Sequence, residues 1–481
     1  MTSRLARWRR QVLLITVLSI FAAAAAHWWW VSRTAGPAKN LILISIDTLR
    51  ADHLGCYGYR RPTSPTLDEL AAHGVLFTDV TAAAPWTLPS HAAMLTGLYP
   101  HHNGIKDYGT RLDDKIPTLA SVLADAGFHT MAIVNHPFLQ PQFGLNRGFQ
   151  QFDYIPEWSA EKRATVDSGP AITNEAIEWL SHVEQRPFFL FLHYYDVHSD
   201  YAPQPEFRRL FADGYDGPVD GTSGQLLKIR AAAIRLGPKD VQHLVDLYDG
   251  EIRQLDTQLS RVLRFLDEHH YTENTLVAVT ADHGEEFMEH GGVLHGRTCY
   301  QEVLAVPLFM RGPGVPRGVR VTQPVSLVDL MPTVLSLMAA PLPERRDGIS
   351  LRPYWERPAG PFPDRVAFAE AFLSRQSAAL ADFLRTPPAG AEPGNVQPGT
   401  TGMVRSGADK FCLNPLSQRN ELYDLRTDPG EQVDLSAREP DRAQRLRGLL
   451  EGFVQHAVVP GASVTLSQEQ LERLRQLGYA P

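Results

Sequence analysis

The chain has 481 residues, a formal net charge of −8 and no run of Lys or Arg beyond its first ten residues. This length is sufficient for a large core and two domains, and the acidic balance argues against nucleic acid as a partner. The three cysteines, at positions 56, 299 and 412, include no pair with metal-ligand spacing such as C-x-x-C, so at most one disulfide can form.

The first 38 residues differ in character from the rest of the chain. Four arginines within positions 4–10 precede an uncharged apolar run over residues 12–31, which is roughly the length that a helix needs to cross a bilayer. Because a cationic flank stays in the cytoplasm, we predict a single-pass signal anchor in the membrane, with the remaining chain periplasmic or extracellular. Small residues at positions 22–26 also offer cleavage sites, so the alternative is a removed signal peptide and a secreted protein.

From Lys39 the pattern of strand, helix and strand predicts an α/β fold with a mostly parallel sheet. Residues 41–46 form a continuous apolar run rich in β-branched side chains, which is typical of a strand buried on both faces, and the run leads to Asp47. Residues 239–270 carry an apolar residue at every third or fourth position, which predicts a long helix packed on the core. Further strands are predicted at 75–77, 128–134, 188–195, 276–279 and 304–309, and further helices at 64–74, 117–126 and 327–338.

The segment PWTLPSHAAMLTG, residues 85–97, predicts a turn that opens a short helix, with the Thr87 hydroxyl just before the helix N-terminus. Pro89 fits the first helical turn, because the N–H groups of that turn have no partner within the helix. A helix N-terminus favours an anion, either a deprotonated nucleophile or a bound oxyanion. Taken alone, the segment favours an ordinary Thr cap followed by a proline, and the case for a nucleophile rests on residues elsewhere in the chain.

Composition predicts how the chain is divided into domains. Residues 203–238 are rich in Gly, Pro and Asp without sustained periodicity, which indicates an insertion or lid within a catalytic domain spanning residues 39–345. Pro- and Gly-rich stretches at 341–365 and 386–401 indicate loops at the edge of a smaller C-terminal α+β subdomain, residues 346–481. This subdomain is predicted to hold a strand at 422–425 and helices near 441–453 and 467–477.

Acidic and imidazole side chains follow three of the predicted strands: Asp47, Asp196 with His198, and Asp282 with His283. Parallel strands end at one edge of a sheet, which is where open α/β sheets bind ligands. Together with Thr87 and His295, these groups offer oxygen and nitrogen ligands without thiolates, which suit Mn²⁺ or Zn²⁺, or Ca²⁺ if oxygens dominate. Each residue alone is more often a helix cap or a packed side chain, but their common place at one edge favours a site.

Several segments resemble signature motifs of the sulfatases, which belong to the alkaline phosphatase superfamily. NLILISIDTLRAD at 40–52 resembles the opening metal-binding strand of that family, and TLPSH…LTG at 87–97 resembles its C-x-P-S-R…L-T-G signature. TADHGE at 280–285 resembles the second metal-binding strand, and LYDL…DP at 422–429 resembles the C-terminal subdomain. The resemblance covers residues 39–435 and implies an alkaline-phosphatase-like mixed, mostly parallel sheet flanked by helices, with a smaller C-terminal α+β subdomain.

The departures from the sulfatase pattern are equally informative. Thr87 stands where the family has the Cys that is converted to formylglycine, and Thr cannot form that aldehyde. A hydrated aldehyde can expel sulfate by collapsing to the carbonyl, whereas a Thr ester must wait for attack by water. His91 replaces the signature Arg, Thr48 replaces the usual second Asp, and His283 stands where many sulfatases have Asn. The set therefore looks closer to phosphonate monoester hydrolases and to Thr-dependent phosphoglycol and phosphoethanolamine transferases, which commonly use Mn²⁺ or Zn²⁺.

The residues and the resemblance together imply one divalent metal ion and a covalent mechanism. The predicted metal ligands are Asp47, Thr87, Asp282 and His283, and the ion would activate Thr87 as the nucleophile. His198 and His295 are predicted to stabilise the ester oxygens or to protonate the leaving group, and His91 is predicted to orient Thr87.

We therefore predict a membrane-anchored, extracytoplasmic hydrolase of sulfate or phosphate esters, with phosphate favoured, that acts on an anionic ester carried by a glycan or a lipid. An acceptor alcohol in place of water would make the protein a transferase that modifies envelope lipid or glycan, and the N-terminal anchor supports that alternative. A non-catalytic descendant that binds an anion or a glycan is the remaining alternative.

Overall fold

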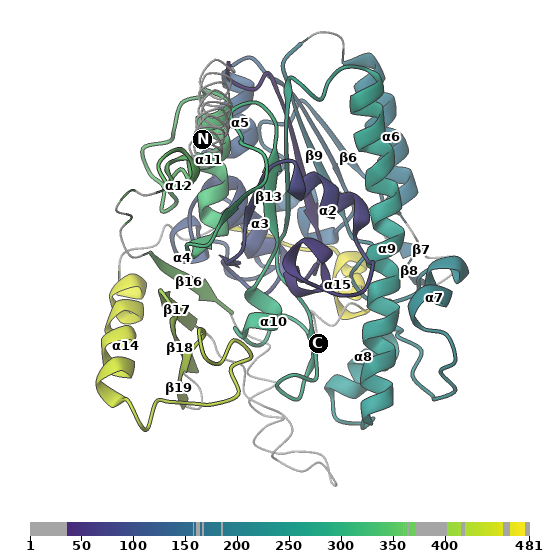
Figure 1. Ribbon diagram of the computed structural model, residues 1–481, viewed down its shortest axis with the longest axis vertical. Coiled ribbons are helices and arrows are strands. Elements are labelled where there is room, and N and C mark those ends of the chain that lie inside the picture. Colours follow the sequence, from purple (N-terminus) through teal and green to yellow (C-terminus); the bar gives the residue numbers. More distant parts are fainter. Residues whose placement is uncertain are drawn as a thin grey trace, which may run out of the picture.

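The computed structural model describes residues 36–156, 158–159, 164–165, 168–183, 186–358, 360, 362, 365–371, 402–414, 419–455 and 462–476 (Figure 1). The apolar N-terminal segment that predicts a membrane anchor lies outside these residues. Within the described ranges, no helix combines the length and the apolar character that crossing a bilayer requires.

An eight-stranded mixed sheet forms the centre of the molecule, in the order β14-β2-β13-β10-β1-β9-β5-β6 (Figure 1). The strands from β10 to β6 run parallel, whereas β13 is antiparallel to both of its neighbours. This confirms the predicted mixed, mostly parallel sheet. The strands are β1 (Asn40–Ile46), β2 (Val75–Phe77), β5 (His129–Val134), β6 (Gln151–Tyr154), β9 (Phe188–Tyr194), β10 (Thr275–Ala281), β13 (Leu308–Arg311) and β14 (Val319–Val321).

Helices cover both faces of this sheet, so every residue of β1, β9 and β10 is buried. On one face α2 (Pro65–Ala72) and α6 (Gly169–His182) pack against α9 (Pro238–Glu268). On the other, α3 (Thr87–Thr96) and α5 (Leu119–Asp125) pack against α11 (Leu330–Leu337). Figure 1 shows α6 and α9 to one side of the strands, with α5 and α11 to the other. The long helix predicted at 239–270 is confirmed as α9.

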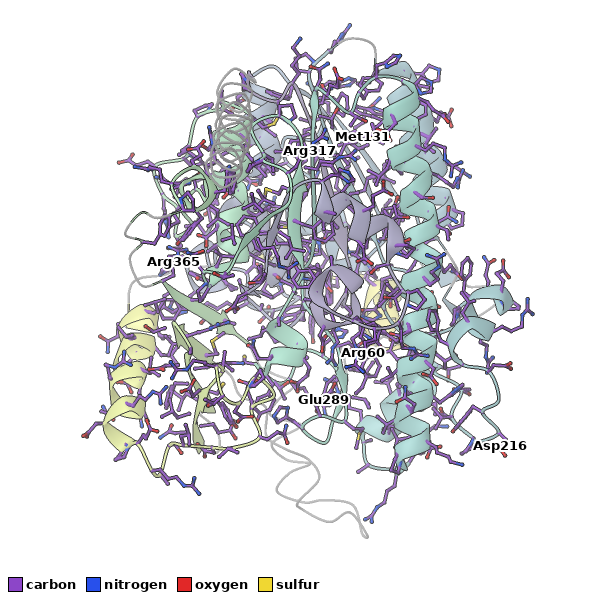
Figure 2. All side chains as sticks on the ribbon, in the orientation of Figure 1. Arg60, Met131, Asp216, Glu289, Arg317 and Arg365 are labelled. Atoms are coloured by element: carbon purple, nitrogen blue, oxygen red, sulfur yellow. The ribbon has the colours of Figure 1, made fainter. Side chains whose placement is uncertain are left out.

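Short elements complete the main body. They are η1 (Ala51–His53), η2 (Gly55–Tyr57), β3 (Val80–Thr81), α4 (Pro100–Asn103), β4 (Thr110–Arg111), η3 (Pro137–Leu139), η4 (Pro141–Phe143), β7 (Trp158–Ser159), β8 (Ala164–Thr165), β11 (Glu286–Phe287), β12 (Val293–Leu294), β15 (Val325–Ser326), η5 (Leu327–Asp329) and α12 (Arg352–Glu356). Glu289, labelled in Figure 2, lies between β11 and β12 and forms an ion pair with Arg50, which fixes this hairpin near the end of β1.

Two local expectations differ from the structure. Residues 203–238, predicted as an aperiodic insertion, contain α7 (Pro205–Phe211), which packs on α9, and α8 (Ser223–Arg230). Each spans about two turns, which is too short to show a helical period. The predicted strand at 304–309 is wrong at its start, because α10 (Gln301–Leu304) ends there and β13 begins only at Leu308. A continuous apolar run does not distinguish a buried helix end from a buried strand.

The C-terminal region forms a second, antiparallel sheet of four strands, β16 (Val366–Glu370), β17 (Gly402–Ser406), β18 (Asp409–Asn414) and β19 (Arg419–Asp424), on which α14 (Pro440–Gln455) packs. β20 (Ala462–Ser463) pairs with β4, and α15 (Gln468–Gln476) follows. Of the four strands only β19 was predicted. Arg405 on β17 and Lys410 on β18 are buried and form ion pairs with Asp79 and Glu431. A charged residue on the buried face breaks the apolar pattern by which a strand is recognised in the sequence.

Asp256 of α9 stabilises the start of α2. Its two carboxylate oxygens accept the N–H groups of Thr66 and Leu67, each at 3.0 Å. These N–H groups belong to the first turn of α2, where the helix itself provides no acceptor. The contact therefore joins two helices that are distant in sequence.

We expect Asp256→Ala to lower the free energy of unfolding by about 1–3 kcal/mol, because two N–H groups at a partly buried helix start lose their acceptor. Urea denaturation followed by circular dichroism measures this. Glu268→Ala, an exposed position on the same helix, is the control and is expected to change the free energy by less than about 0.5 kcal/mol. Equal effects of the two substitutions would contradict the capping role.

Candidate functional site

The register of the central strands brings two acidic side chains together. Ile46 of β1 pairs with Ala281 of β10, so Asp47 and Asp282, the next residues of the two strands, lie side by side. One ligand atom from each of Asp47, Asp282 and His283 lies within 4.8 Å of the other two, and all three residues are fully buried. The structure thus brings together three of the predicted metal ligands.

Asp282 is held by backbone N–H groups through one of its two oxygens. Its Oδ1 accepts the N–H of His283 at 2.9 Å and that of Thr48 at 3.3 Å. Thr48 has a φ of 56°, a left-handed conformation that β-branched residues rarely adopt, and its hydroxyl donates to the Val197 carbonyl at 3.1 Å. Among the described residues, Oδ2 of Asp282 has no hydrogen-bond partner.

Asp47 has fewer hydrogen-bond partners than Asp282. Neither of its carboxylate oxygens has a hydrogen-bond partner within the part of the chain that the structure describes. Burial, together with the charges of Asp282 and Glu285, raises the pKa of Asp47 well above its usual value. Buried carboxylate oxygens need a proton or a cation. The three orphaned oxygens of Asp47 and Asp282, facing an imidazole, therefore fit a divalent metal ion.

Thr87 is the first residue of α3, with Trp86 as its N-cap, which corrects the prediction that Thr87 precedes the helix. Its Oγ1 lies 3.5 Å from Nε2 of His283. The Nδ1–H of His283 donates to the Gly284 carbonyl at 2.9 Å, so the Nε2 lone pair faces Thr87 and the two carboxylates. The fourth predicted ligand thus joins the other three.

His91 lies one turn below Thr87 on the same helix. Its Nδ1–H donates to the Thr87 carbonyl at 2.9 Å, and its Nε2 accepts the Ser45 hydroxyl at 2.9 Å. On the same helix, Ser90 donates its hydroxyl to the carbonyl of Asp282 at 2.6 Å. These bonds fix the N-terminus of α3 against the ends of β1 and β10. His91 contacts the backbone of Thr87, where a residue that orients Thr87 would lie.

His198 and His295, the other two predicted catalytic residues, lie beside His283. The ring centroid of His295 is 4.3 Å from that of His283 and 4.9 Å from that of His198. Nδ1–H of His295 donates to Oε1 of Glu285 at 2.9 Å, while Oε2 of Glu285 accepts the hydroxyl of Tyr201 at 2.7 Å. Burial lowers the pKa of His198 to about 3 and that of His295 well below its usual value, so both imidazoles are neutral at pH 7.

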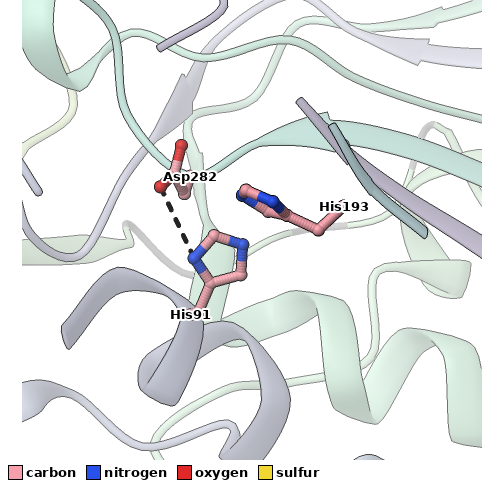
Figure 3. A group of neighbouring side chains, drawn as sticks. All are labelled: His91, His193 and Asp282. Atoms are coloured by element: carbon pink, nitrogen blue, oxygen red, sulfur yellow. Dashed lines mark ion pairs between the residues drawn. The ribbon is translucent and has the colours of Figure 1, made fainter. Parts of the chain in front are cut away.

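Three site residues were not identified from the sequence. Glu285 is the last residue of the segment TADHGE at 280–285, and the resemblance of that segment to a sulfatase motif was the available signal. His193 of β9 places Nε2 at 3.5 Å from Oδ2 of Asp47, and His136 after β5 places Nε2 at 3.9 Å from the same oxygen. His193 lies within an apolar strand, where its position gives no signal, whereas His136 follows the predicted strand at 128–134, and that position was the available signal. Figure 3 shows His91, His193 and Asp282 turned toward one another.

Asp196 uses its Oδ1 for a contact outside the cluster of Asp47, Asp282 and His283. Its Oδ1 accepts the N–H of Gly169 at 2.7 Å, at the first residue of α6. A carboxylate at a helix N-terminus is stabilised by the unpaired N–H groups there. Asp196 therefore acts as a helix cap, although it follows a strand that ends at the same edge.

A cavity of about 210 Å³ opens beside His295 and is lined by Arg230, Arg235, Arg297 and one carboxylate, Glu286, among others. Arg230 donates to the carbonyl of His295 at 2.8 Å. The charge of Arg230, together with burial, lowers the pKa of Arg297 to about 9. Two guanidinium groups that repel each other are stabilised by an anion, so the cavity fits a negatively charged ligand.

Comparison with known proteins gives consistent results. The Delta 4,5-hexuronate-2-O-sulfatase of Bacteroides thetaiotaomicron is 24% identical over 454 residues, covering 86% of this chain and 88% of that protein. The solved phosphonate monoester hydrolase of Agrobacterium radiobacter has a TM-score of 0.68 at 22% identity, covering 87% of this chain and 95% of its own.

A further solved structure, described as being in complex with its substrate D-glucosamine-2-N,6-O-disulfate, has a TM-score of 0.68 at 19% identity and covers 87% of this chain and 97% of its own. These structural likenesses establish the fold. The model of the Sulfatase family matches residues 39–340, a range that contains the cluster of Asp47, Asp282 and His283, Thr87 and both neighbouring imidazoles. The chain belongs to the sulfatase family of ester hydrolases.

Proposed function

We propose that this protein hydrolyses anionic esters with Thr87 as its covalent nucleophile, and that it favours phosphate esters over sulfate esters. The observation that carries the proposal is the position of the Thr87 hydroxyl, buried at the N-terminus of α3 and 3.5 Å from Nε2 of His283. Family membership supports metal-dependent ester hydrolysis. The Thr in place of the aldehyde-forming Cys supports the preference for phosphorus.

Asp47, Thr87, Asp282 and His283 would hold one divalent ion. When bound, such an ion lowers the pKa of a coordinated hydroxyl and neutralises charge on the ester oxygens. Carboxylate and imidazole ligands fit Mn²⁺ or Zn²⁺ better than Ca²⁺, which prefers oxygen ligands throughout.

The reaction has two displacement steps. Oγ of Thr87 attacks phosphorus, and the bond from phosphorus to the leaving oxygen breaks. The proton of Thr87 passes to Nε2 of His295, which delivers it to the leaving alcohol. The non-bridging oxygens face the first turn of α3, where unpaired N–H groups favour negative charge. His198 lies beside His295, and its ring would have to be protonated to donate an Nε2–H to the same oxygens, because its Nδ1–H is already given to the Ser199 carbonyl.

In the second step, water attacks the phosphorus of the Thr87 ester, the bond between phosphorus and Oγ breaks, and phosphate is released. The proton lost by the water passes to Nε2 of His295 and from there to Oγ, which restores the Thr87 hydroxyl. Glu285 holds Nδ1–H of His295 throughout, so Nε2 is the atom that accepts and donates the proton. A Thr ester has no neighbouring hydroxyl on the same carbon and cannot collapse to a carbonyl. Release therefore needs attack by water on the ester, without the collapse that an aldehyde hydrate allows.

The substrate is proposed to be an anionic ester on a glycan or a lipid. The cavity beside His295 supports an anionic substrate, and the structural neighbour with a bound sulfated sugar supports a glycan. The apolar run at 12–31 supports a body anchored to a membrane and facing away from the cytoplasm, with residues 39–345 as the catalytic domain and 346–481 as a separate subdomain.

The test compares turnover of an aryl phosphate monoester, a phosphate diester, a phosphonate monoester and an aryl sulfate by the full-length protein with Mn²⁺, Zn²⁺ or Ca²⁺. We expect a phosphorus ester to be the best substrate, and an acid quench during turnover to leave a phosphoryl group on the peptide that carries Thr87. Faster sulfate turnover, or an adduct on another residue, would overturn the proposal. Phosphorylated glycerol among the products, when glycerol is added, would indicate the transferase instead.

A further inference from the structure

We propose that His193 is a further ligand of the metal ion held by Asp47, Thr87, Asp282 and His283, so that two imidazoles and two carboxylates surround the ion beside the Thr87 hydroxyl. The inference rests on the metal-dependent function proposed above and extends it to the identity of the ion. A site of this composition selects a transition metal and discriminates against Ca²⁺.

His193 is buried at the centre of the sheet with a nitrogen aimed at the two carboxylates. Its ring is fully buried, and Nε2 lies 3.5 Å from Oδ2 of Asp47. One ligand atom from each of His193, His91 and Asp282 lies within 4.8 Å of the other two. Across the described residues this Nε2 has no hydrogen-bond partner, and neither do the carboxylate oxygens it faces.

The hydrogen bond at the other ring nitrogen fixes the tautomer. Asn135 donates its amide N–H to the Ser168 hydroxyl at 2.7 Å, which turns its carbonyl oxygen toward Nδ1 of His193 at 2.9 Å. A carbonyl oxygen can only accept, so Nδ1 carries the hydrogen and Nε2 carries the lone pair. A histidine that binds metal through one nitrogen while donating the other N–H to an oxygen is the usual arrangement in metal sites.

The two other imidazoles around these carboxylates are held in ways that exclude them as ligands. Nδ1 of His136 accepts the N–H of Phe138 at 3.1 Å, so Nε2 carries the hydrogen in the neutral ring. His91 donates through Nδ1 to Thr87, and its Nε2 lone pair is already used by the Ser45 hydroxyl. Of the three rings, His193 is the one whose free lone pair faces Asp47. Figure 3 shows His193 beside Asp282, which also forms an ion pair with Nδ1 of His91 at 3.4 Å.

The spacing of the ligand atoms fits a common centre. His283 Nε2 lies 3.4 Å from Oδ2 of Asp282 and 3.7 Å from Oδ1 of Asp47, and His193 Nε2 lies 3.5 Å from Oδ2 of Asp47. Ligands bound at about 2.1 Å in a tetrahedron are about 3.4 Å apart, and each of the three distances is close to that value. The two carboxylates link the imidazoles, because His283 faces Oδ1 of Asp47 and His193 faces Oδ2 of the same residue.

Pulsed electron paramagnetic resonance of the full-length protein loaded with Mn²⁺ tests the inference, because each coordinated imidazole contributes one directly bound nitrogen to the spectrum. We expect two nitrogens in the unmodified protein and one in His193→Gln, with Mn²⁺ affinity reduced at least about 10-fold in the variant. His136→Gln is the matched control, a buried histidine near the same oxygen, and is expected to retain both nitrogens.

The unmodified protein decides the question even if His193→Gln fails to fold. One coordinated nitrogen in it, assigned to His283 by loss in His283→Gln, would overturn the role of His193 while the proposed hydrolysis stands. Two nitrogens that persist in a folded His193→Gln would also overturn it. Failure to bind Mn²⁺ or Zn²⁺ at all would overturn the inference together with the metal-dependent function.

Discussion

Thr87→Ala is expected to lower kcat on the best phosphorus ester by about 10⁴-fold or more, because it removes the atom that forms the covalent ester. Thr87→Ser keeps a hydroxyl on the first residue of α3 and is expected to retain most of the activity, within about 10- to 100-fold. The measurement is steady-state turnover with saturating Mn²⁺ or Zn²⁺. The contrast between the two variants separates loss of the nucleophile from a general disturbance of the site.

The structure provides the control for this experiment. Asp47, Asp282 and His283 remain in Thr87→Ala, so the variant should still bind metal and unfold at nearly the temperature of the unmodified protein. A metal-loaded, folded Thr87→Ala protein that keeps activity within 10-fold would show that water, not Thr87, attacks the ester. The acid-quenched adduct should be absent in Thr87→Ala and present in Thr87→Ser.

Glu285→Gln is expected to have the second largest effect, lowering kcat/KM by about 10²-fold or more on esters with poor leaving groups. The carboxylate of Glu285 accepts Nδ1–H of His295 at 2.9 Å and so sets which nitrogen of that ring handles the proton. An amide can present its N–H instead and favour the other tautomer. Measurement against a series of aryl and alkyl phosphates should give a steeper dependence on the leaving-group pKa than in the unmodified protein.

Tyr201→Phe is the matched control for Glu285→Gln. It removes the hydrogen bond to Oε2 of Glu285 but leaves the contact between Oε1 and His295 in place, so its effect should be several times smaller. An equal loss for aryl and alkyl esters in Glu285→Gln would contradict proton delivery through His295. It would indicate that Glu285 acts on the metal ligands through its charge alone.

The strongest parts of the sequence prediction rest on local patterns. The β-branched run before Asp47, and a similar run before Asp282, reveal buried parallel strands because only such strands are apolar on both faces. The apolar period of α9 was equally clear, since 31 residues repeat it many times. The helix that starts at Thr87 was predicted within one residue of its true start, because Pro89 and the following small residues define its first turns.

Elements were not predicted correctly where the apolar pattern was too short or was interrupted by charged residues. α7 and α8 are too short to show a period, and the run at 304–309 reads alike as a helix end and as a strand. In the C-terminal sheet, β17 and β18 carry buried Arg405 and Lys410, and the carboxylates that neutralise them lie far away in the sequence. An ion pair between distant segments leaves no trace in either segment alone.

By itself, the sequence determined the α/β class and the position of Thr87 at a helix start, because both depend on residues adjacent in the chain. It also determined that Asp47, Asp282 and His283 lie close together, because parallel strands end at one edge of the sheet. Only the tertiary structure decided which further side chains enter the site. His193 lies beside Asp47 because the register between β9 and β1 pairs His193 with Ser45. Asp196 instead accepts the N–H of Gly169 at the start of α6. Both outcomes are set by pairing and packing between distant segments, which no local pattern encodes.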